Sequence, residues 1–275
     1  MEFNELVKKA KLRLLRMHYE SRIGHIGGNL SALDAMLFLH CNVMAKEDMF
    51  VLSKGHSAGA LYTTLWAAGR LSNDDLNKFH QDGAKLAGHP VGGWTPGISF
   101  STGSLGHGLS LSAGVAFARK LKQEKGRVFC LMSDGEWEEG SNWEALIFIA
   151  HHRLNNLVLL VDVNGLQGFG DTTAVASLEP LADKIRSFGV NVLEIDGHDP
   201  SALDSALKTD PINRPDDPGH PVPGEVTTIS ELPTVILLRT IKGHGISFME
   251  NRMEWHYLPL TEAQYLQAVK EVGGA

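Results

Sequence analysis

The sequence predicts an α/β fold in which a parallel sheet is covered by helices on both faces. Short, continuously apolar runs such as 127–132 and 157–161 alternate with segments of helical periodicity, as expected for strands that are buried on both sides. Each run also leads into a turn that contains Gly, Asp or His. Because ligands bind beyond the carboxyl ends of parallel strands, we expect these turns to meet at one edge of the sheet.

The composition is that of an ordinary globular protein, and we expect one domain over residues 1–275. Hydrophobic residues make up 43% and charged residues 21% of the chain, and the net charge of -7 gives no indication of a nucleic-acid partner. Apolar runs are too short for a membrane span, and the first residues do not resemble a signal peptide. Cys41 and Cys130 lie in apolar runs, so we expect buried thiols in a reducing cytoplasm.

In the first half, apolar spacing predicts a helix over 3–22 that stops at Gly24. A second helix is predicted over 31–39, with Ser31 as N-cap and Asp34 at the third helical position. Val51-Leu52 ends a short strand. A helix then runs from about Ala58 to a glycine cap at 69, another begins near 72, and a further one opens at 107.

In the second half, strands and helices alternate more regularly. Strands are predicted over 127–132, 157–161, 190–195 and 235–238, and helices over 142–151 and 181–188. The stretch 209–226 holds five prolines and is interpreted as an exposed loop before the last strand.

Ser133-Asp134-Gly135 is the first motif that carries chemistry. A carboxylate at the end of a buried strand is a hard oxygen ligand for Mg²⁺ or Ca²⁺, and a glycine followed by a helix suits a bound phosphate. Asn164 ends the neighbouring predicted strand, so its amide oxygen and the Leu166 carbonyl are further candidate ligands. Taken alone, capping of turns explains Asp134 and Asn164 equally well.

Histidines in glycine-containing turns form the second motif. Glycine allows the backbone to approach a ligand closely, and histidine offers hydrogen bonds that switch near neutral pH. A zinc site is the rival interpretation, but no pair has His-x-x-x-His spacing. The residues concerned are His25, His56, His89, His107, His244 and His256.

A third motif is the acidic, Trp-rich segment 136–144. Acidic residues at a helix start complement the helix dipole, which is a sufficient structural explanation. Four carboxylates beside an anion-binding turn also make an interface plausible.

These motifs, in this order, resemble the N-terminal half of the transketolases, which use thiamin diphosphate. The cofactor motif of that family, Gly-Asp-Gly followed after about thirty residues by Asn, is similar to Ser133-Asp134-Gly135 through Asn164. Segments 52–56, 88–90, 102–106, 136–145, 164–167 and 196–199 look like transketolase too. Segment 242–256 is similar to the form found when a transketolase is split into two chains.

The resemblance implies a role for each matching position. Asp134, Asn164 and the Leu166 carbonyl would hold Mg²⁺ or Ca²⁺, while His25, His89 and His256 would face the substrate as catalytic residues. Glu139 and Glu144 would lie at an interface between subunits. Thiamin diphosphate would be bound by His56, Gly103, Leu105, Gly135, Glu136, Asn164 and His256.

Several positions depart from the family pattern. Ser133 replaces the first glycine of the motif, and Ile26 replaces a common proline. Val91, His107 and Tyr257 also differ, and all three are expected near the substrate entrance, so the departures bear on which sugars are used.

The resemblance implies a subunit that transfers a two-carbon ketol unit from a ketose phosphate to an aldose phosphate through a thiamin diphosphate carbanion. Complete transketolases are more than twice as long as 275 residues, so the pyrimidine-binding domain is expected on a C-terminal partner subunit, in an α2β2 assembly. One alternative is a specialised sugar ketol-transferase or an enzyme like 1-deoxyxylulose-phosphate synthase. Another is a non-catalytic remnant that binds the cofactor or regulates a partner.

Overall fold

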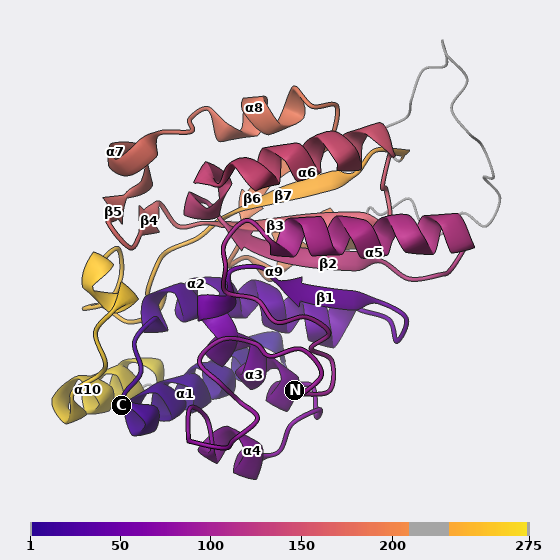
Figure 1. Cartoon of the computed structure of the whole chain (residues 1–275). Helices are drawn as coiled ribbons and strands as arrows, with labels where there is room; N and C mark the ends of the chain where they lie inside the picture. Colours follow the sequence, from indigo (N-terminus) through magenta and orange to yellow (C-terminus); the bar gives the residue numbers. More distant parts are fainter. Residues whose placement is uncertain (1, 209–230, 274–275) are drawn as a thin grey trace.

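A five-stranded parallel sheet with the order β1-β2-β3-β7-β6 lies at the centre of the molecule (Figure 1). The computed structural model describes residues 2–208 and 231–273. The strands are β1 (Met49–Leu52), β2 (Val128–Ser133), β3 (Leu157–Val163), β6 (Asn191–Asp196) and β7 (Thr234–Arg239). A small antiparallel hairpin of β4 (Leu166–Gln167) and β5 (Gly170–Asp171) follows β3.

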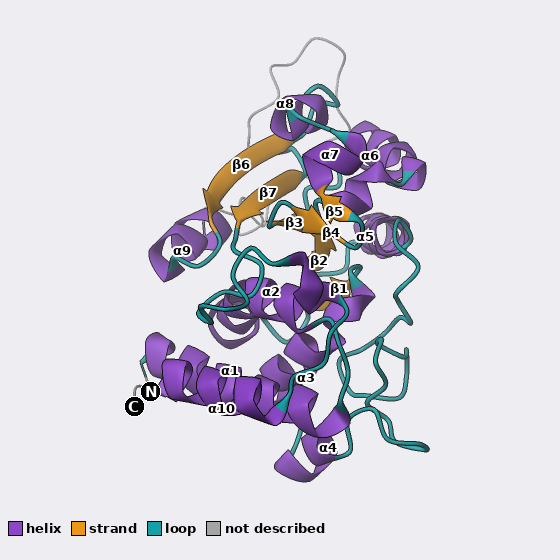
Figure 2. Cartoon of the chain, turned by 90° about the vertical axis from the view of Figure 1, so that its left-hand side faces the viewer, coloured by secondary structure: helices purple, strands orange, loops and turns teal. Residues whose placement is uncertain are grey.

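Helices cover both faces of the sheet, which confirms the predicted fold class (Figures 1 and 2). One layer holds α1 (Phe3–Ser21), α2 (Ile26–Phe38), α3 (Ala58–Ala67), α9 (Pro200–Lys208) and α10 (Glu262–Gly273). The other holds α5 (Gly108–Lys122), α6 (Gly140–His151) and α8 (Leu181–Arg186). The short helices α4 (Asn73–Asn77) and α7 (Thr172–Ala176) lie in connecting segments.

Four strands of the sheet, β2, β3, β6 and β7, supply side chains to two separate hydrophobic cores, whereas β1 supplies side chains to one of them. In β2, Phe129 and Leu131 pack with the layer of α1, α2 and α3, whereas Val128, Cys130 and Met132 pack with α5 and α6. Neighbouring side chains of a strand point to opposite faces of the sheet, and here helices shield both faces from water. The predicted strands are therefore continuously apolar rather than alternating.

The predicted second helix is wrong in its start. Helix α2 begins at Ile26, and all of its residues are buried, including Gly27 and Gly28. Ser31 is thus not an N-cap but an internal residue, and its hydroxyl donates to the Gly28 carbonyl at 3.1 Å. The glycine-rich start predicts a turn by local propensity, but burial of the whole helix between α1, α3 and the sheet outweighs that preference.

Other predictions have mixed outcomes. The N-cap near residue 72 is confirmed as a capping box between Ser72 and Asp75, and the glycine cap at Gly69 has a φ of 73°. Cys130 is buried as expected, but Cys41 is exposed because it lies in the π-helical turn Leu39–Val43 that ends α2. The proline-rich stretch 209–226 lies outside the described residues.

Besides the short α7, the helices α9 and α10 are also missing from the elements predicted from the sequence. Their apolar residues contribute to the same core as α1 and α2. Within residues 2–208 and 231–273, no helix combines the length and apolar character needed to cross a membrane.

Candidate active site

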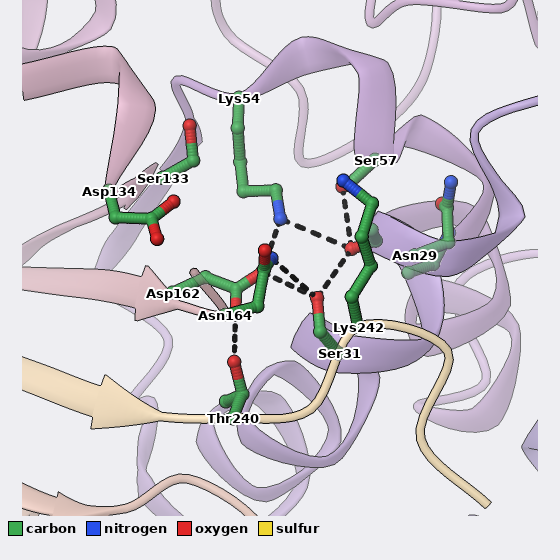
Figure 3. A network of polar contacts seen from close by, with 12 residues as sticks. Asn29, Ser31, Lys54, Ser57, Ser133, Asp134, Asp162, Asn164, Thr240 and Lys242 are labelled. Carbon is green, nitrogen blue, oxygen red and sulfur yellow. Dashed lines mark hydrogen bonds and ion pairs between the residues drawn. The ribbon is translucent and has the colours of Figure 1, made fainter. Parts of the chain in front are cut away.

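The turns that follow β1, β2, β3 and β7 meet beside the first turn of α2, at the carboxyl edge of the sheet (Figure 3). At its centre is a buried ion pair between Lys54, after β1, and Asp162, near the end of β3. The ammonium also donates to the Gly28 carbonyl at 3.1 Å. Three further groups donate to the carboxylate of Asp162, namely the hydroxyls of Ser31 and Thr240 and the amide of Asn164.

This network satisfies Asp162 completely. Burial alone would raise the pKa of its carboxyl group, but the charge of Lys54 and the hydrogen bonds outweigh burial and lower it. Sequence reasoning missed the pair, because its two residues are 108 positions apart and each lies in an otherwise apolar or turn-like context.

Asp134 lies next to this network, but no cation contacts it among the described residues. Its two carboxylate oxygens accept from the backbone N–H groups of Gly135 at 2.9 Å and Gly165 at 2.7 Å. Burial, together with the nearby charge of Asp162, raises the pKa of Asp134 to about 6. In Figure 3 the carboxylate points toward the side on which Asn164 lies. A buried carboxylate of this kind is suited to a bound cation.

The two other predicted metal ligands lie on the same side of the site. The amide oxygen of Asn164 accepts from the Leu166 N–H at 3.1 Å. The Leu166 carbonyl accepts from the ammonium of Lys242 at 3.0 Å, so a positive charge already lies against this oxygen. The three predicted ligands thus border one polar region of carboxylate and neutral oxygens.

Four of the six predicted histidines gather in front of this region. Ring centroids of His25 lie 5.5 Å from His56, 6.2 Å from His89 and 5.0 Å from His256, and those of His56 and His256 are 5.6 Å apart. They come from four separate segments of the chain. The two others, His107 and His244, do not join them: His107 is exposed, and His244 packs on His198.

All four clustered histidines favour the neutral imidazole. Burial is the largest cause that lowers the pKa of each ring, and it is reinforced at His56 by Lys54 and at His256 by Lys242. The pKa of His256 falls to about 3. Nδ1 of His25 is buried and has no hydrogen-bond partner among the described residues, so it is free to bind a ligand group.

The backbone of His25 takes a left-handed conformation, with a φ of 65°. Its N–H donates to the His256 carbonyl at 3.1 Å, and its carbonyl accepts from the Asn29 side chain at 2.7 Å. The Asn29 amide also donates to the His56 carbonyl at 3.2 Å. These hydrogen bonds link the backbones of His25, His56 and His256 to one another.

Lys242 is a site residue that sequence reasoning missed, although it belongs to a motif that stands out for its histidine. It is 2% exposed, and its ammonium contacts the Leu166 carbonyl and His256 Nδ1, the latter at 3.2 Å. Burial and the charge of Lys54 lower its pKa to about 8. The available signal was a lysine three residues after the end of a buried strand, in a glycine-containing turn.

The predicted glycines lie where close approach requires them. Gly103 has a φ of 138°, and a Cβ there would lie 2.7 Å from the His89 ring. A Cβ on Gly55 would lie 2.7 Å from the Gly103 nitrogen, so the turn of Gly103 runs directly against the turn of His56. Gly135 faces Gln167, and Leu105 is half-buried in the same loop as Gly103.

The acidic segment divides into buried and exposed residues. Glu136 is fully buried, and its carboxylate accepts from Ser53, from the Gly106 N–H at 3.0 Å and from the Ser133 N–H at 3.3 Å. It therefore braces the turns around the site. Glu139 and Glu144 are exposed at the start of α6, as a position at an interface requires.

Residues 24–274 match the family model described as "Transketolase, thiamine diphosphate binding domain". The chain belongs to the transketolase family. It is 36% identical over 274 residues to a protein of Phocaeicola vulgatus named as one of the subunits of apulose-4-phosphate transketolase, covering 96% of this chain and 92% of that protein. It is also 34% identical to the 6-deoxy-6-sulfo-D-fructose transketolase subunit SqwG of a Clostridium species, covering 91% and 88% of the two chains.

Solved transketolases have the same fold. The enzyme from Campylobacter jejuni matches with a TM-score of 0.86 and 26% identity, over 99% of this chain and 43% of that one. The enzyme from Leishmania mexicana matches with a TM-score of 0.87 over 99% and 41%, and at 24% identity this match concerns the fold alone. This transketolase-family chain thus spans about two fifths of the solved enzymes that it matches.

Proposed function

We propose that this chain is the diphosphate-binding subunit of a two-subunit transketolase, with residues 1–275 as one thiamin diphosphate-binding unit. Together with a partner that carries the pyrimidine-binding domain, it would transfer a two-carbon ketol unit between sugar phosphates. The observation that carries the proposal is the gathering of His25, His56, His89 and His256. Lys242 connects this cluster to the predicted metal ligands, because its ammonium contacts both His256 and the Leu166 carbonyl. Relatives of similar length that are named as transketolase subunits support the division into two chains, and an α2β2 assembly in the cytoplasm stays a prediction.

The residues present fit a divalent cation and a diphosphate. Asp134 supplies one buried carboxylate, while Asn164 and the Leu166 carbonyl supply neutral oxygens, a donor set typical of Mg²⁺ or Ca²⁺. The diphosphate would be held by the ring N–H of His56, the backbone N–H of Gly135 and the buried ammonium of Lys242. When bound, thiamin diphosphate supplies the nucleophilic carbon that breaks and forms the carbon–carbon bond.

The histidines supply proton transfer and orientation. The His25 ring is half-buried and His89 is exposed, so a sugar hydroxyl can reach both rings. Because burial keeps these rings neutral, each can accept a proton when the donor sugar loses its hydroxyl hydrogen. His256 lies between Lys242 and His25 and would bind the diphosphate side as well as the substrate.

A specialised sugar substrate is favoured by Tyr257. Its ring centroid lies 4.8 Å from that of His256, and its hydroxyl donates to the Gly168 carbonyl at 2.8 Å, which ties the β4–β5 hairpin to the site. The family pattern has glycine where Tyr257 stands, so this chain places an additional aromatic side chain next to His256. The relatives named for apulose 4-phosphate and 6-deoxy-6-sulfofructose support an unusual sugar phosphate.

The test is reconstitution of the chain with its partner, followed by an assay of ketol transfer over a panel of sugar phosphates. We expect no turnover by the chain alone and turnover on mixing. Transfer of a two-carbon unit derived from pyruvate by decarboxylation would indicate a synthase instead, and cofactor binding without turnover would indicate a non-catalytic remnant.

Three alanine variants separate the histidine roles in the same assay. His25→Ala and His89→Ala should each lower kcat by ~10²–10⁴, the usual range for general acid–base catalysis, and leave cofactor affinity nearly unchanged. His56→Ala should first weaken cofactor binding. Loss of cofactor binding in His25→Ala with kcat retained at saturation would contradict its assigned place.

A further inference from the structure

A second cluster of titratable side chains lies behind the site, where two sequence motifs meet. Asp34 belongs to α2, His198 follows β6, and His244 follows β7, and their polar atoms lie within 4.8 Å of one another. The motifs Asp196-Gly197-His198 and Lys242-Gly243-His244 both resemble transketolase, yet neither histidine lies among the four that face the site.

Hydrogen bonding fixes the tautomer of His198. The backbone N–H of Ile241 donates to His198 Nε2 at 3.0 Å, so this nitrogen must present a lone pair. Nδ1 therefore carries the hydrogen and donates to the Asp34 carboxylate at 2.8 Å. Both nitrogens of a neutral ring are used, one toward a carboxylate and the other toward the backbone.

The same arrangement disfavours a metal ion in this cluster. Nε2 of His198 uses its lone pair to accept from Ile241, and Nδ1 carries the hydrogen that faces Asp34. His198 therefore has no lone pair left to bind a cation. In addition, the ammonium of Lys11 lies 3.6 Å from Asp34 and already balances the carboxylate.

Packing holds the ring of His198 in place. His244 stacks on it with a centroid distance of 3.5 Å and an angle of 22° between the rings. Burial and the charge of Lys11 lower the pKa of His244 to about 4, so two neutral rings stack without repulsion. Glu250 lies 3.7 Å from the far nitrogen of His244.

The bond from His198 reaches the backbone next to a cofactor-facing side chain. Ile241 precedes Lys242, whose carbonyl accepts from the Asn251 N–H at 3.0 Å. The next N–H, that of Gly243, donates to the Gly27 carbonyl in α2 at 2.9 Å. The peptide that bears Lys242 is thus fastened on both sides. On the sheet side, His198 holds the Ile241 N–H, and the preceding N–H, that of Thr240, donates to the Val163 carbonyl at 3.2 Å.

We propose that His198, oriented by Asp34, is a positioning residue that holds the Ile241–Lys242 backbone so that the Lys242 ammonium faces the diphosphate site. This inference rests on the proposed function, since it takes Lys242 to contact the cofactor. A ring that only filled space would need neither the lone pair toward Ile241 nor the hydrogen toward Asp34.

The first test compares His198→Phe with His198→Gln. Phenylalanine keeps the stack on His244 but removes both hydrogen bonds, whereas the glutamine carboxamide oxygen can replace Nε2 as acceptor for Ile241. Amide hydrogen exchange of the full chain without cofactor should rise about tenfold or more at Ile241 in His198→Phe, and His198→Gln should restore much of the protection.

Cofactor affinity and kcat of the reconstituted enzyme give the second readout. His198→Phe should raise the Kd for thiamin diphosphate with Mg²⁺ by roughly 10–100-fold, the scale of lost outer-shell contacts, with kcat at saturation nearly unchanged. His152→Phe is the matched control: it makes the same exchange beside Phe117 and Phe148 on the opposite face of the sheet and should change neither quantity.

Several results would overturn the proposal. These are unchanged exchange at Ile241 in His198→Phe, an equal loss of affinity in His198→Gln, or faster exchange spread equally over α1 and α2. If His198→Phe does not fold, nitrogen NMR of the wild-type chain decides alone: a hydrogen on Nε2 of His198 at neutral pH contradicts it, and a hydrogen on Nδ1 supports it.

Failure of this proposal is distinguishable from failure of the proposed function. If Lys242→Met leaves the cofactor Kd unchanged, the assigned role of Lys242 is wrong, whatever His198 does. If Lys242→Met weakens binding but His198→Phe does not, only the positioning role is wrong.

Discussion

The polar region at the sheet edge has a closed half and an open half. In the closed half, Lys54 and Asp162 neutralise each other, and the neighbouring hydroxyls donate to the carboxylate. In the open half, within the described part of the chain, Asp134 has only backbone donors and Lys242 contacts only neutral groups. A satisfied buried pair serves stability, whereas unneutralised buried charges of both signs, held apart, are suited to a metal ion and a diphosphate.

Breaking the closed half should have the largest effect. Lys54→Met leaves the carboxylate of Asp162 buried and unpaired, which typically costs about 3–5 kcal/mol. Denaturant unfolding of the chain without cofactor measures this loss. The double variant Lys54→Met/Asp162→Leu should recover much of the stability, and an equal loss in both variants would show that the pair itself is not responsible.

Asp134→Asn should have the next largest effect, on binding as well as on folding. If Asp134 is the charged metal ligand that we propose, its removal should weaken Mg²⁺-dependent cofactor binding by about 100-fold or more, because loss of a residue that only orients a metal ligand already costs roughly 10–100-fold. Calorimetry on the reconstituted complex measures it. Unfolding free energy without metal should fall by about 1–3 kcal/mol, because the amide nitrogen of asparagine cannot accept from one of the two backbone N–H groups that donate to Asp134.

Lys242→Met should weaken cofactor binding about tenfold, a loss typical of a charged hydrogen bond. Stability without cofactor should be unchanged or slightly increased, because burial and Lys54 disfavour the charge of Lys242 and lower its pKa. The contrast with Lys54→Met is the sharpest test of the two halves. A stability loss in Lys242→Met as large as in Lys54→Met would remove the distinction.

The last effect concerns pH. Burial lowers the pKa of His40 in the folded chain to about 3, whereas in the unfolded chain this pKa is 6.5. Below pH 6.5 the unfolded chain therefore binds a proton at His40 that the folded chain does not bind. Stability should therefore fall between about pH 6.5 and 3, by up to about 1.4 kcal/mol per pH unit for each such histidine. His18, His244 and His256 add to the fall, because burial lowers their pKa values to about 4, 4 and 3.

His40→Phe should remove the share of this fall that comes from His40, and Lys54→Met should not. The pKa of Asp162 is lowered below 3.8, so its pair keeps its contribution until the pH falls below that value. Asp134, with a pKa raised to about 6, gains stability as it takes up a proton and opposes part of the fall. Unfolding midpoints across this pH range test the assignment.

Local patterns predicted the sheet well, because strands such as β2 and β3 are buried on both faces and their apolar runs are unbroken. They failed at α2, where Gly27 and Gly28 suggest a turn and only tertiary burial makes a helix. The motif at 133–135 led to Asp134, and the histidine turns led to four rings that do converge.

The closed half could not be predicted in this way. Lys54 and Asp162 are partners only because β1 and β3 flank β2, and no local spacing encodes that neighbourhood. Lys242 stands in a motif whose evident chemistry is its histidine. Its importance depends on burial against Leu166 and His256, which only the folded chain shows.

The left-handed backbone of His25 has a consequence for chemical complementation. A residue with a Cβ is held in this conformation at a cost of about 1–2 kcal/mol, whereas glycine adopts it freely. His25→Gly would relax the backbone and open a space of imidazole shape beside the cofactor edge. Free imidazole added to such an enzyme could occupy that space without a covalent link, so position 25 allows the ring's chemistry to be separated from the chain that normally carries it.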